Sequence, residues 1–187
     1  SGTIVTVSNV GCNGGNDGAV DLTVSGGIPG YQYNWNGPAG FTATTQDISN
    51  IAAGNYIVAI TDLNGCKKSD LNIVVDPSAI SLDYNLTNVL CNGDLTGNYD
   101  LIVTGGTPTY QYSWVGPTGF VFSNDTTQDQ SNLIAGEYTV TVTDGNNCFT
   151  SLTGIISEPS PFIMTSDYKN VSCFGFTNWR DKGSFIS

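Results

Sequence analysis

Cysteine is the residue type with the most reactive chemistry in this chain of 187 residues, which has five cysteines and no histidine. They are Cys12, Cys66, Cys91, Cys148 and Cys173. No two of them form a Cys-x-x-Cys pair, so zinc sites of the usual spacing are excluded. Without histidine, Ser-His and Cys-His nucleophile pairs are excluded as well. The regular recurrence of the cysteines favours disulfides over buried free thiols, and therefore an oxidising compartment.

Two short segments place an aspartate and an asparagine at alternate positions, Asp62 with Asn64 and Asp144 with Asn146. Two oxygen ligands at this spacing match the first half of a calcium-binding loop, which makes calcium the candidate cofactor. The rest of the EF-hand pattern is absent. Asp and Asn are also typical of tight turns closed by their side chains. We favour the turn and keep calcium as the alternative.

The charge of the chain argues against several partners. Sixteen acidic residues face five basic ones, giving a net charge of −11. This negative field repels phosphate, so nucleic acid and anionic lipid are excluded as expected partners. No apolar run approaches the ~20 residues of a membrane-spanning helix.

Signatures of catalysis are missing from the sequence. It has no Gly-x-Ser-x-Gly elbow, no phosphate-binding loop and no dinucleotide fingerprint. Paired carboxylates can hydrolyse glycosides, but a catalytic pair needs a single special location. Here the acids recur as pairs in two copies of one pattern, as structural positions do: Asp21 and Asp100, Asp47 and Asp129, Asp62 and Asp144. We therefore predict that the chain is not an enzyme.

An internal repeat organises the chain. Residues 26–41 match residues 105–120 at eleven of sixteen positions, and the segments around Tyr56 and Tyr138 match as well. Asn170-Val-Ser-Cys173 then resembles the openings of both copies. We predict one repeat over 1–78, a second over 79–160, and the start of a third over 161–187.

Each copy predicts an all-β fold. Apolar residues alternate over short segments, turn residues separate these segments at intervals of roughly ten, and no segment has helical periodicity. In the first copy the expected strands cover 4–8, 19–25, 31–35, 55–61 and 71–75. The pattern favours tandem immunoglobulin-like antiparallel β-sandwiches of about 80 residues each.

Two aromatic positions support this fold. Ile51-x-x-Gly54-x-Tyr56, repeated at Tyr138, has the form of a tyrosine corner, in which the hydroxyl bonds upstream backbone. Trp35 and Trp114 lie where such a fold has its core tryptophan. Because they recur at equivalent positions, we expect core packing instead of a sugar-stacking platform.

The disulfide pairing has two solutions. Each complete copy carries two cysteines, which favours Cys12–Cys66 and Cys91–Cys148, each adding about 4 kcal/mol of stability in the chain-entropy model. In an ordinary immunoglobulin topology, however, the first and last loops lie at opposite ends of the sandwich. The alternative is therefore a bond between repeats, from Cys12 to Cys148. We expect the pairing within repeats, which requires a departure from that topology.

Four motifs in combination resemble the SprB repeat. They are Val-x-Cys-x-Gly, Gly-Gly-x-Pro-x-Tyr-x-Tyr-x-Trp, Ala-Gly-x-Tyr-x-Val-x-(Val/Ile)-Thr-Asp and Asn-x-Cys, found in the first copy at 10–14, 26–35, 53–62 and 64–66. The resemblance covers nearly the whole chain. It implies that the chain is part of a very large surface protein of Bacteroidetes that takes part in gliding motility. It also implies export by the type IX secretion system and an extracellular location on the bacterial cell surface.

Three functions are compatible with this resemblance. The first is a structural and adhesive segment of a cell-surface filament, whose partners are the neighbouring repeats. The second is a calcium-dependent module that binds polysaccharide or abiotic surfaces. For it, the candidate contacts are aromatic residues that the copies do not share: Phe122, Phe174, Phe176 and Trp179. The third is an accessory domain of a secreted enzyme.

Glycosylation is a further expectation. Asn85, Asn124 and Asn170 open Asn-x-Ser/Thr triplets, which fit N-linked attachment. Asp125-Thr126-Thr127 resembles the Asp-Thr-x acceptor of O-glycosylation in Bacteroidetes, and it lies in an insertion unique to the second copy. We therefore predict Thr126 as an exposed modification site.

Overall fold

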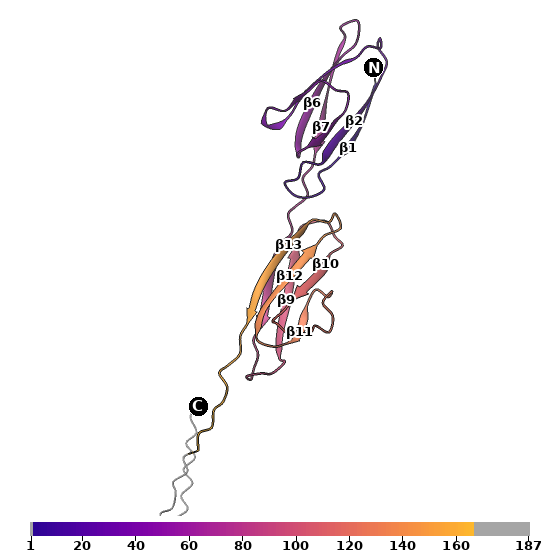
Figure 1. Ribbon diagram of the computed structural model, residues 1–187. Coiled ribbons are helices and arrows are strands. Elements are labelled where there is room, and N and C mark those ends of the chain that lie inside the picture. The colour runs from indigo at the N-terminus through magenta and orange to yellow at the C-terminus, as the bar shows by residue number, and fades with distance from the viewer. Residues whose placement is uncertain (1, 167–187) are drawn as a thin grey trace, which may run out of the picture.

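The computed structural model describes residues 2–166, which form two bodies of β-strands joined end to end (Figure 1). The first body contains β1 (Gly2–Ser8), β2 (Gly18–Ser25), β3 (Gln32–Asn36), β4 (Thr42–Ala43), β5 (Ile48–Ile51), β6 (Gly54–Thr61) and β7 (Lys67–Val74). The second contains β8 (Ser81–Thr87), β9 (Gly97–Thr104), β10 (Gln111–Val115), β11 (Gln130–Leu133), β12 (Gly136–Thr143) and β13 (Phe149–Ile156). The short 3₁₀ turn η1 (Pro38–Gly40) is the single helical element of the described residues.

Each body is a sandwich of two antiparallel sheets. In the first sandwich the sheets have the strand orders β1-β2-β5 and β4-β3-β6-β7, and in the second β8-β9-β11 and β10-β12-β13. In both sandwiches the first, second and fifth positions of the fold share one sheet and the third, sixth and seventh share the other, which is immunoglobulin-like connectivity; β4 adds an edge strand beside β3 in the first sandwich. The predicted all-β, immunoglobulin-like fold is therefore confirmed.

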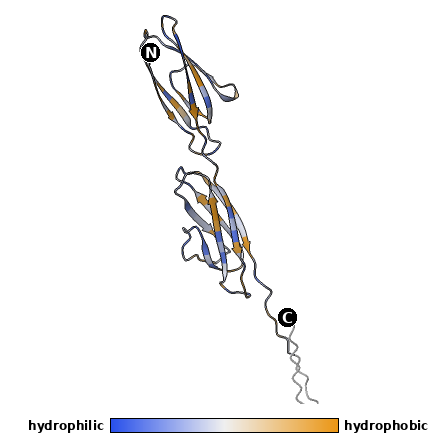
Figure 2. Cartoon of the chain, turned by 180° about the vertical axis from the view of Figure 1, so that it is seen from behind, coloured by the Kyte–Doolittle hydropathy of each residue, from blue (hydrophilic) through white to orange (hydrophobic). Residues whose placement is uncertain are grey.

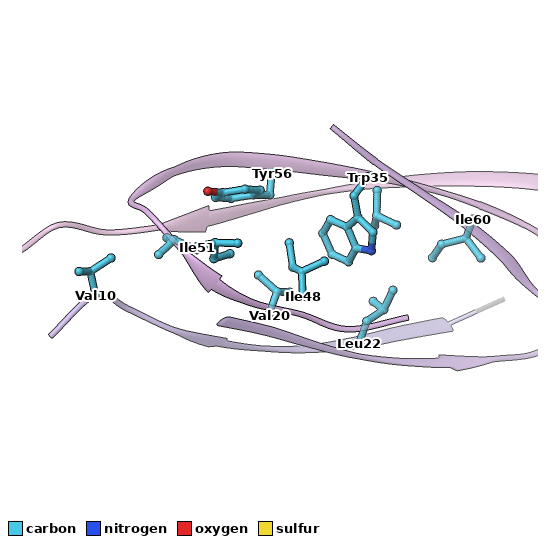
Figure 3. Packing of buried hydrophobic residues seen from close by; sticks show 10 residues of the cluster. Val10, Val20, Leu22, Trp35, Ile48, Ile51, Tyr56 and Ile60 are labelled. Carbon is cyan, nitrogen blue, oxygen red and sulfur yellow. The ribbon is translucent and has the colours of Figure 1, made fainter. Parts of the chain in front are cut away.

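The first core lies between the sheets because inward and outward side chains alternate along the strands (Figure 3). On β2, Val20 and Leu22 are buried and the residues between them are more exposed. Trp35 is fully buried, and its indole N–H donates to the carbonyl of Thr45 at 2.9 Å. Trp114 repeats this contact with Thr127. Both tryptophans are therefore core residues.

The second core differs from the first at two facing positions. Where β2 has Val20, β9 has Tyr99, and where β7 has Asn72, β13 has Gly154. A Cβ atom at residue 154 would lie 2.7 Å from Cε2 of Tyr99. The glycine therefore makes room for the larger ring, which packs against Trp114 with 4.8 Å between ring centroids.

The tyrosine corners form as the sequence predicts. The hydroxyl of Tyr56 donates to the carbonyl of Ala52 at 2.9 Å, and that of Tyr138 donates to the carbonyl of Ile134 at 3.0 Å. Gly54 and Gly136, with φ of 152° and 150°, precede the tyrosines. A Cβ atom on Gly54 would lie 2.3 Å from the Pro38 ring, so glycine allows the Gly-Pro turn to cover the corner.

The insertion in the second copy changes one sheet edge. β4 pairs with β3 in the first sandwich, whereas the corresponding segment of the second is a loop without strand structure. Phe122 in this loop packs against the core, with its ring centroid 6.0 Å from Tyr138 and 5.1 Å from Phe120. Phe122 is therefore half-buried against the second core, and its role as a contact residue stays a prediction.

Hydrophobic and hydrophilic residues mix along the strands of both sandwiches (Figure 2). No helix in the described residues is both long and apolar enough to cross a membrane.

Candidate functional site: the junction between the sandwiches

A disulfide bond joins the two sandwiches. Cys12, in the loop between β1 and β2, is bonded to Cys148, in the loop between β12 and β13, with 5.6 Å between the Cα atoms and 136 residues of sequence between them. The expected pairing within repeats, Cys12–Cys66 and Cys91–Cys148, is therefore wrong. The alternative bond between repeats is the one that forms.

Topology explains this pairing. The β1–β2 loop and the β6–β7 loop, which carries Cys66, lie at opposite ends of the first sandwich because β1, β2, β6 and β7 follow immunoglobulin connectivity. The β12–β13 loop of the second sandwich is at the end that meets the first. A disulfide requires Cα atoms within about 7 Å, and among the four cysteines that the structure describes, Cys12 and Cys148 meet this requirement and are bonded, whereas Cys66 and Cys91 are free.

The β1–β2 loop is fixed from its own side by the end of the first sandwich. The Asn9 side chain accepts a hydrogen bond from the amide of Val75, whose carbonyl accepts from the amide of Val10. The Asn13 side chain donates to the carbonyl of Pro77 at 2.9 Å. The amide of Gly14 donates to the Asp76 carboxylate at 3.0 Å. These bonds hold Cys12 in place from both sides of the loop.

The second sandwich binds the linker and the loop directly. The Asn146 side chain donates to the carbonyl of Gly11 at 2.9 Å, and the amide of Gly106 donates to the carbonyl of Ser78 at 3.0 Å. Gly105 has φ of 70°, and a Cβ atom on it would lie 2.0 Å from the carbonyl oxygen of Ala79. Glycine is therefore required where the linker crosses this turn.

Asp144 organises the loop that carries Cys148. One oxygen of its carboxylate accepts the amides of Asn146 and Cys148, both at 2.9 Å, and the other accepts the amide of Thr107 at 2.9 Å. The amide of Thr107, followed by those of Cys148 and Asn146, lowers the pKa of this carboxyl against an opposing effect of burial. This is the turn-forming role that the sequence favours.

Asp62 has the same role at the far end of the first sandwich. It accepts the amides of Asn64, Cys66 and Ile28, and its pKa is lowered mainly by the amides of Cys66 and Ile28. Among the described residues, no group of three or more Cys, Asp or Glu side chains is placed to hold a metal ion. Calcium at these loops stays a prediction.

A hollow of about 420 Å³ lies beside the disulfide. Cys12 and Asn13 line it from the first sandwich, residues 77–80 from the linker, and Asp144 and residues 147–150 from the second. The junction is thus a built contact with a covalent bond, direct hydrogen bonds and a partly open flank.

Comparison with known proteins places this architecture in a family. The family model described as "SprB repeat" matches residues 4–40 and 84–119, which are the opening halves of the two sandwiches. Both stretches match the SprB repeat. The family that the four motifs predict is therefore confirmed. No curated protein matches the chain.

Solved structures resemble the SprB repeats of this chain only distantly. Among them is the mouse nectin-like molecule 4 ectodomain (Ig1–Ig3), 14% identical over 86% of this chain and 66% of that chain, with a TM-score of 0.39. The amphioxus IgVJ-C2 molecule is 15% identical over 78% and 98%, with a TM-score of 0.36. Murine CEACAM1b is 13% identical over 83% and 100%, with a TM-score of 0.32. The fold assignment rests on the strand order given above.

The remaining candidate residues do not gather into a site. Thr126 is exposed, and its hydroxyl bonds the Asn124 side chain, so modification there stays a prediction. Phe174, Phe176 and Trp179 lie outside the described residues. Gly11, Gly105 and Gly106 are junction residues that were not predicted. For Gly105 and Gly106 a signal exists, because the Gly-Gly pair recurs at residues 26–27.

Proposed function

We propose that this chain is a non-enzymatic spacer segment of a bacterial cell-surface adhesin filament. The observation that carries the proposal is the junction, where a disulfide and hydrogen bonds join one SprB repeat to the next. A series of small units in which each contacts only its neighbours extends in one dimension and holds a binding tip away from the cell.

Mechanical load is the specific demand that this junction meets. Cys12 and Cys148 lie 136 residues apart, so a force on the chain ends passes through β1, the disulfide and β13 and bypasses the strands from β2 to β12. The sandwiches can then open without letting the bracketed chain extend. A segment that must transmit tension during adhesion and gliding gains directly from this arrangement.

The same bond and the family match support an extracellular location. Disulfides persist in oxidising compartments, which supports an extracellular place. The resemblance to SprB repeats adds export by type IX secretion and display on the cell surface.

A second candidate is a weak polysaccharide-binding module that gains avidity by number. One observation favours it. Ile57, Leu71 and Ile73 are about half exposed on the outer face of β6 and β7, where Ile57 and Leu71 are cross-strand partners. The second repeat has Thr139 and Thr153 at the positions of the first two, so this apolar patch belongs to one repeat only.

Retention of the full chain on immobilised polysaccharide and on glass, in calcium and then in EDTA, separates the two functions. A spacer is not retained in either buffer. Retention that EDTA abolishes contradicts the spacer and supports calcium-dependent binding. The variant Ile57→Thr/Leu71→Thr, which copies the second repeat, is the matched control: retention that it removes locates binding on the β6–β7 face.

A further inference from the structure

Both outer ends of the described chain carry a cysteine at a position that is bonded in the junction. Cys66 is the counterpart of Cys148, and Cys91 is the counterpart of Cys12. Within the described residues Cys66 and Cys91 are exposed and unbonded, whereas Cys12 and Cys148 are half-buried by the junction. The question is whether the two ends also share the rest of the junction's architecture.

The Cys91 end reproduces the Cys12 end bond by bond. The Asn88 side chain accepts from the amide of Ser157, whose carbonyl accepts from the amide of Val89. The Asn92 side chain donates to the carbonyl of Pro159 at 3.2 Å, and the amide of Gly93 donates to the Glu158 carboxylate at 2.7 Å. These are the counterparts of the bonds that Asn9, Asn13 and Gly14 make. The loop that presents Cys91 is therefore already in the conformation that presents Cys12.

The Cys66 end reproduces the receiving side of the junction. Asp62 accepts the amides of Asn64 and Cys66 as Asp144 accepts those of Asn146 and Cys148. A hollow of about 250 Å³ lies there, lined by Asp62, Cys66, Lys67 and Lys68. Their counterparts in the second repeat line the junction hollow, where linker residues 77–80 also contribute to the wall.

The charges of the two ends are opposite. Lys67 and Lys68 flank Cys66, whereas Asp94 and Glu158 lie around Cys91. Around Cys12, Asp76 holds the place of Glu158, and Asp17 is a second acidic residue in the loop. The Cys66 end therefore suits the acidic loop of a repeat of the same kind.

We propose that each outer end binds another copy of this repeat and closes a disulfide of the Cys12–Cys148 type, with Cys91 bonded to the repeat that follows and Cys66 to the repeat that precedes. This proposal deepens the proposed function by naming the partner of the segment's ends. Each bond forms by oxidation of two thiols, which give up two protons and two electrons to a disulfide reagent such as oxidised glutathione, leaving two molecules of reduced glutathione.

The consequence is an interlaced series of bonds. The two cysteines of one repeat would go to different neighbours, so successive disulfide-bracketed segments overlap. Every repeat inside such a series would lie within two overlapping disulfide-closed segments. Unfolding of one repeat could then not extend that repeat to its full chain length.

A three-repeat chain tests the proposal. It consists of residues 1–162 followed directly by a second copy of residues 81–160, which keeps the native linker, and it contains six cysteines. Each repeat brings its own complete core. After refolding with oxidised and reduced glutathione, free thiols are alkylated and counted by mass. Two disulfides are expected, Cys12–Cys148 and Cys91 to Cys148 of the added copy, leaving two free thiols.

Two variants decide the assignment. Cys91→Ser in the first copy of the second repeat should raise the count from two to three, because its partner becomes free. Cys66→Ser should lower the count to one without disturbing either bond. A count of four in the parent, or a decrease on Cys91→Ser, overturns the proposal. Loss of the Cys12–Cys148 bond in the parent also counts against it. The thiol count is independent of retention on surfaces, so this proposal and the spacer function can fail separately.

Discussion

Tyr99 shows how one side chain can be fully buried without a complete set of polar contacts. Its hydroxyl has no hydrogen-bond partner among residues 2–166, in contrast to the hydroxyl of Tyr138. Burial, and secondarily the charge of Tyr84, raises the pKa of Tyr99 to about 12. The folded chain therefore holds this proton at pH values at which the unfolded chain, with an ordinary pKa near 10, loses it.

The sign of the pH effect follows. Because the folded pKa is the higher one, the contribution of Tyr99 is fully present below pH 10 and is lost as the pH rises from about 10 to 12. We expect Tyr99→Phe to reduce the loss of unfolding free energy over this range. Denaturant titrations at pH 8, 10 and 11 measure the effect, and an unchanged alkaline loss would contradict it.

At neutral pH the same variant should be neutral or stabilising by about 1 kcal/mol, because it removes a buried hydroxyl without a partner. Tyr138→Phe is the contrast: it removes a bonded hydroxyl and should cost about 1 kcal/mol. If Tyr99→Phe lowers the free energy of unfolding as much as Tyr138→Phe does, the Tyr99 hydroxyl has a hydrogen-bond partner, which contradicts this prediction.

At the residue scale, the sequence predicts what depends on local pattern. Trp35, Trp114 and the tyrosine corners were correct because each recurs at the same strand position in both copies. The half-buried position of Phe122 could not be predicted, because the exposure of a loop aromatic depends on how the inserted residues fold back. This folding depends on tertiary contacts, which leave no periodic pattern in the sequence.

At the scale of elements, the side chains at two facing positions of β9 and β13 are complementary in size across the second core. Gly154 leaves the space that the Tyr99 ring fills, whereas Val20 and Asn72 occupy the equivalent places in the first repeat. We expect Gly154→Ala to cost about 1–3 kcal/mol by overpacking. In a Tyr99→Val background the cost should shrink, because the smaller side chain frees the space.

Chemical denaturation of the two single variants and the double variant measures this coupling. A coupling energy above about 0.5 kcal/mol supports direct contact between the strands. Additive effects of the two substitutions would contradict it.

The loops that Asp62 and Asp144 organise are alike in bonding but differ in surroundings. Asp144 is 5% exposed beneath the junction, whereas Asp62 is half-buried. We expect Asp144→Ala to increase hydrogen exchange at Thr107, Asn146 and Cys148 more than Asp62→Ala increases it at Ile28, Asn64 and Cys66. Water can replace the lost acceptor at the open end, and burial hinders this at the junction. Equal increases at both loops would contradict a structural role for the junction.

Low pH should weaken the same hydrogen bonds that these substitutions remove. The pKa of both carboxyls is lowered in the folded chain, so their stabilising effect is present above the ordinary value near 3.8 and is lost as the pH falls through the folded pKa.

The element scale also explains why the disulfide pairing was predicted wrongly. The count of two cysteines per copy fits pairing within a repeat and pairing between repeats equally well. What separates the two is that the β1–β2 and β6–β7 loops lie at opposite ends of a sandwich. The sequence predicts this topology, and the geometric objection should have outweighed the cysteine count.

At the scale of the whole molecule, we expect the junction disulfide to let the two repeats carry load as one unit. The bond spans 136 residues. At 3.3–3.6 Å per extended residue, breaking this bracket releases about 450–490 Å of chain. While the bond is closed, unfolding of either sandwich does not release this length of chain.

Single-molecule pulling on the full chain from its two ends tests this claim most directly. Fully unfolded Cys12→Ser chains should be longer than oxidised parent chains by about 450–490 Å, and reducing agent should bring the parent to the length of the variant. A difference of about 180–190 Å would instead indicate a Cys12–Cys66 bond within the first repeat. No difference would mean that Cys12 forms no disulfide, which contradicts a junction that transmits tension.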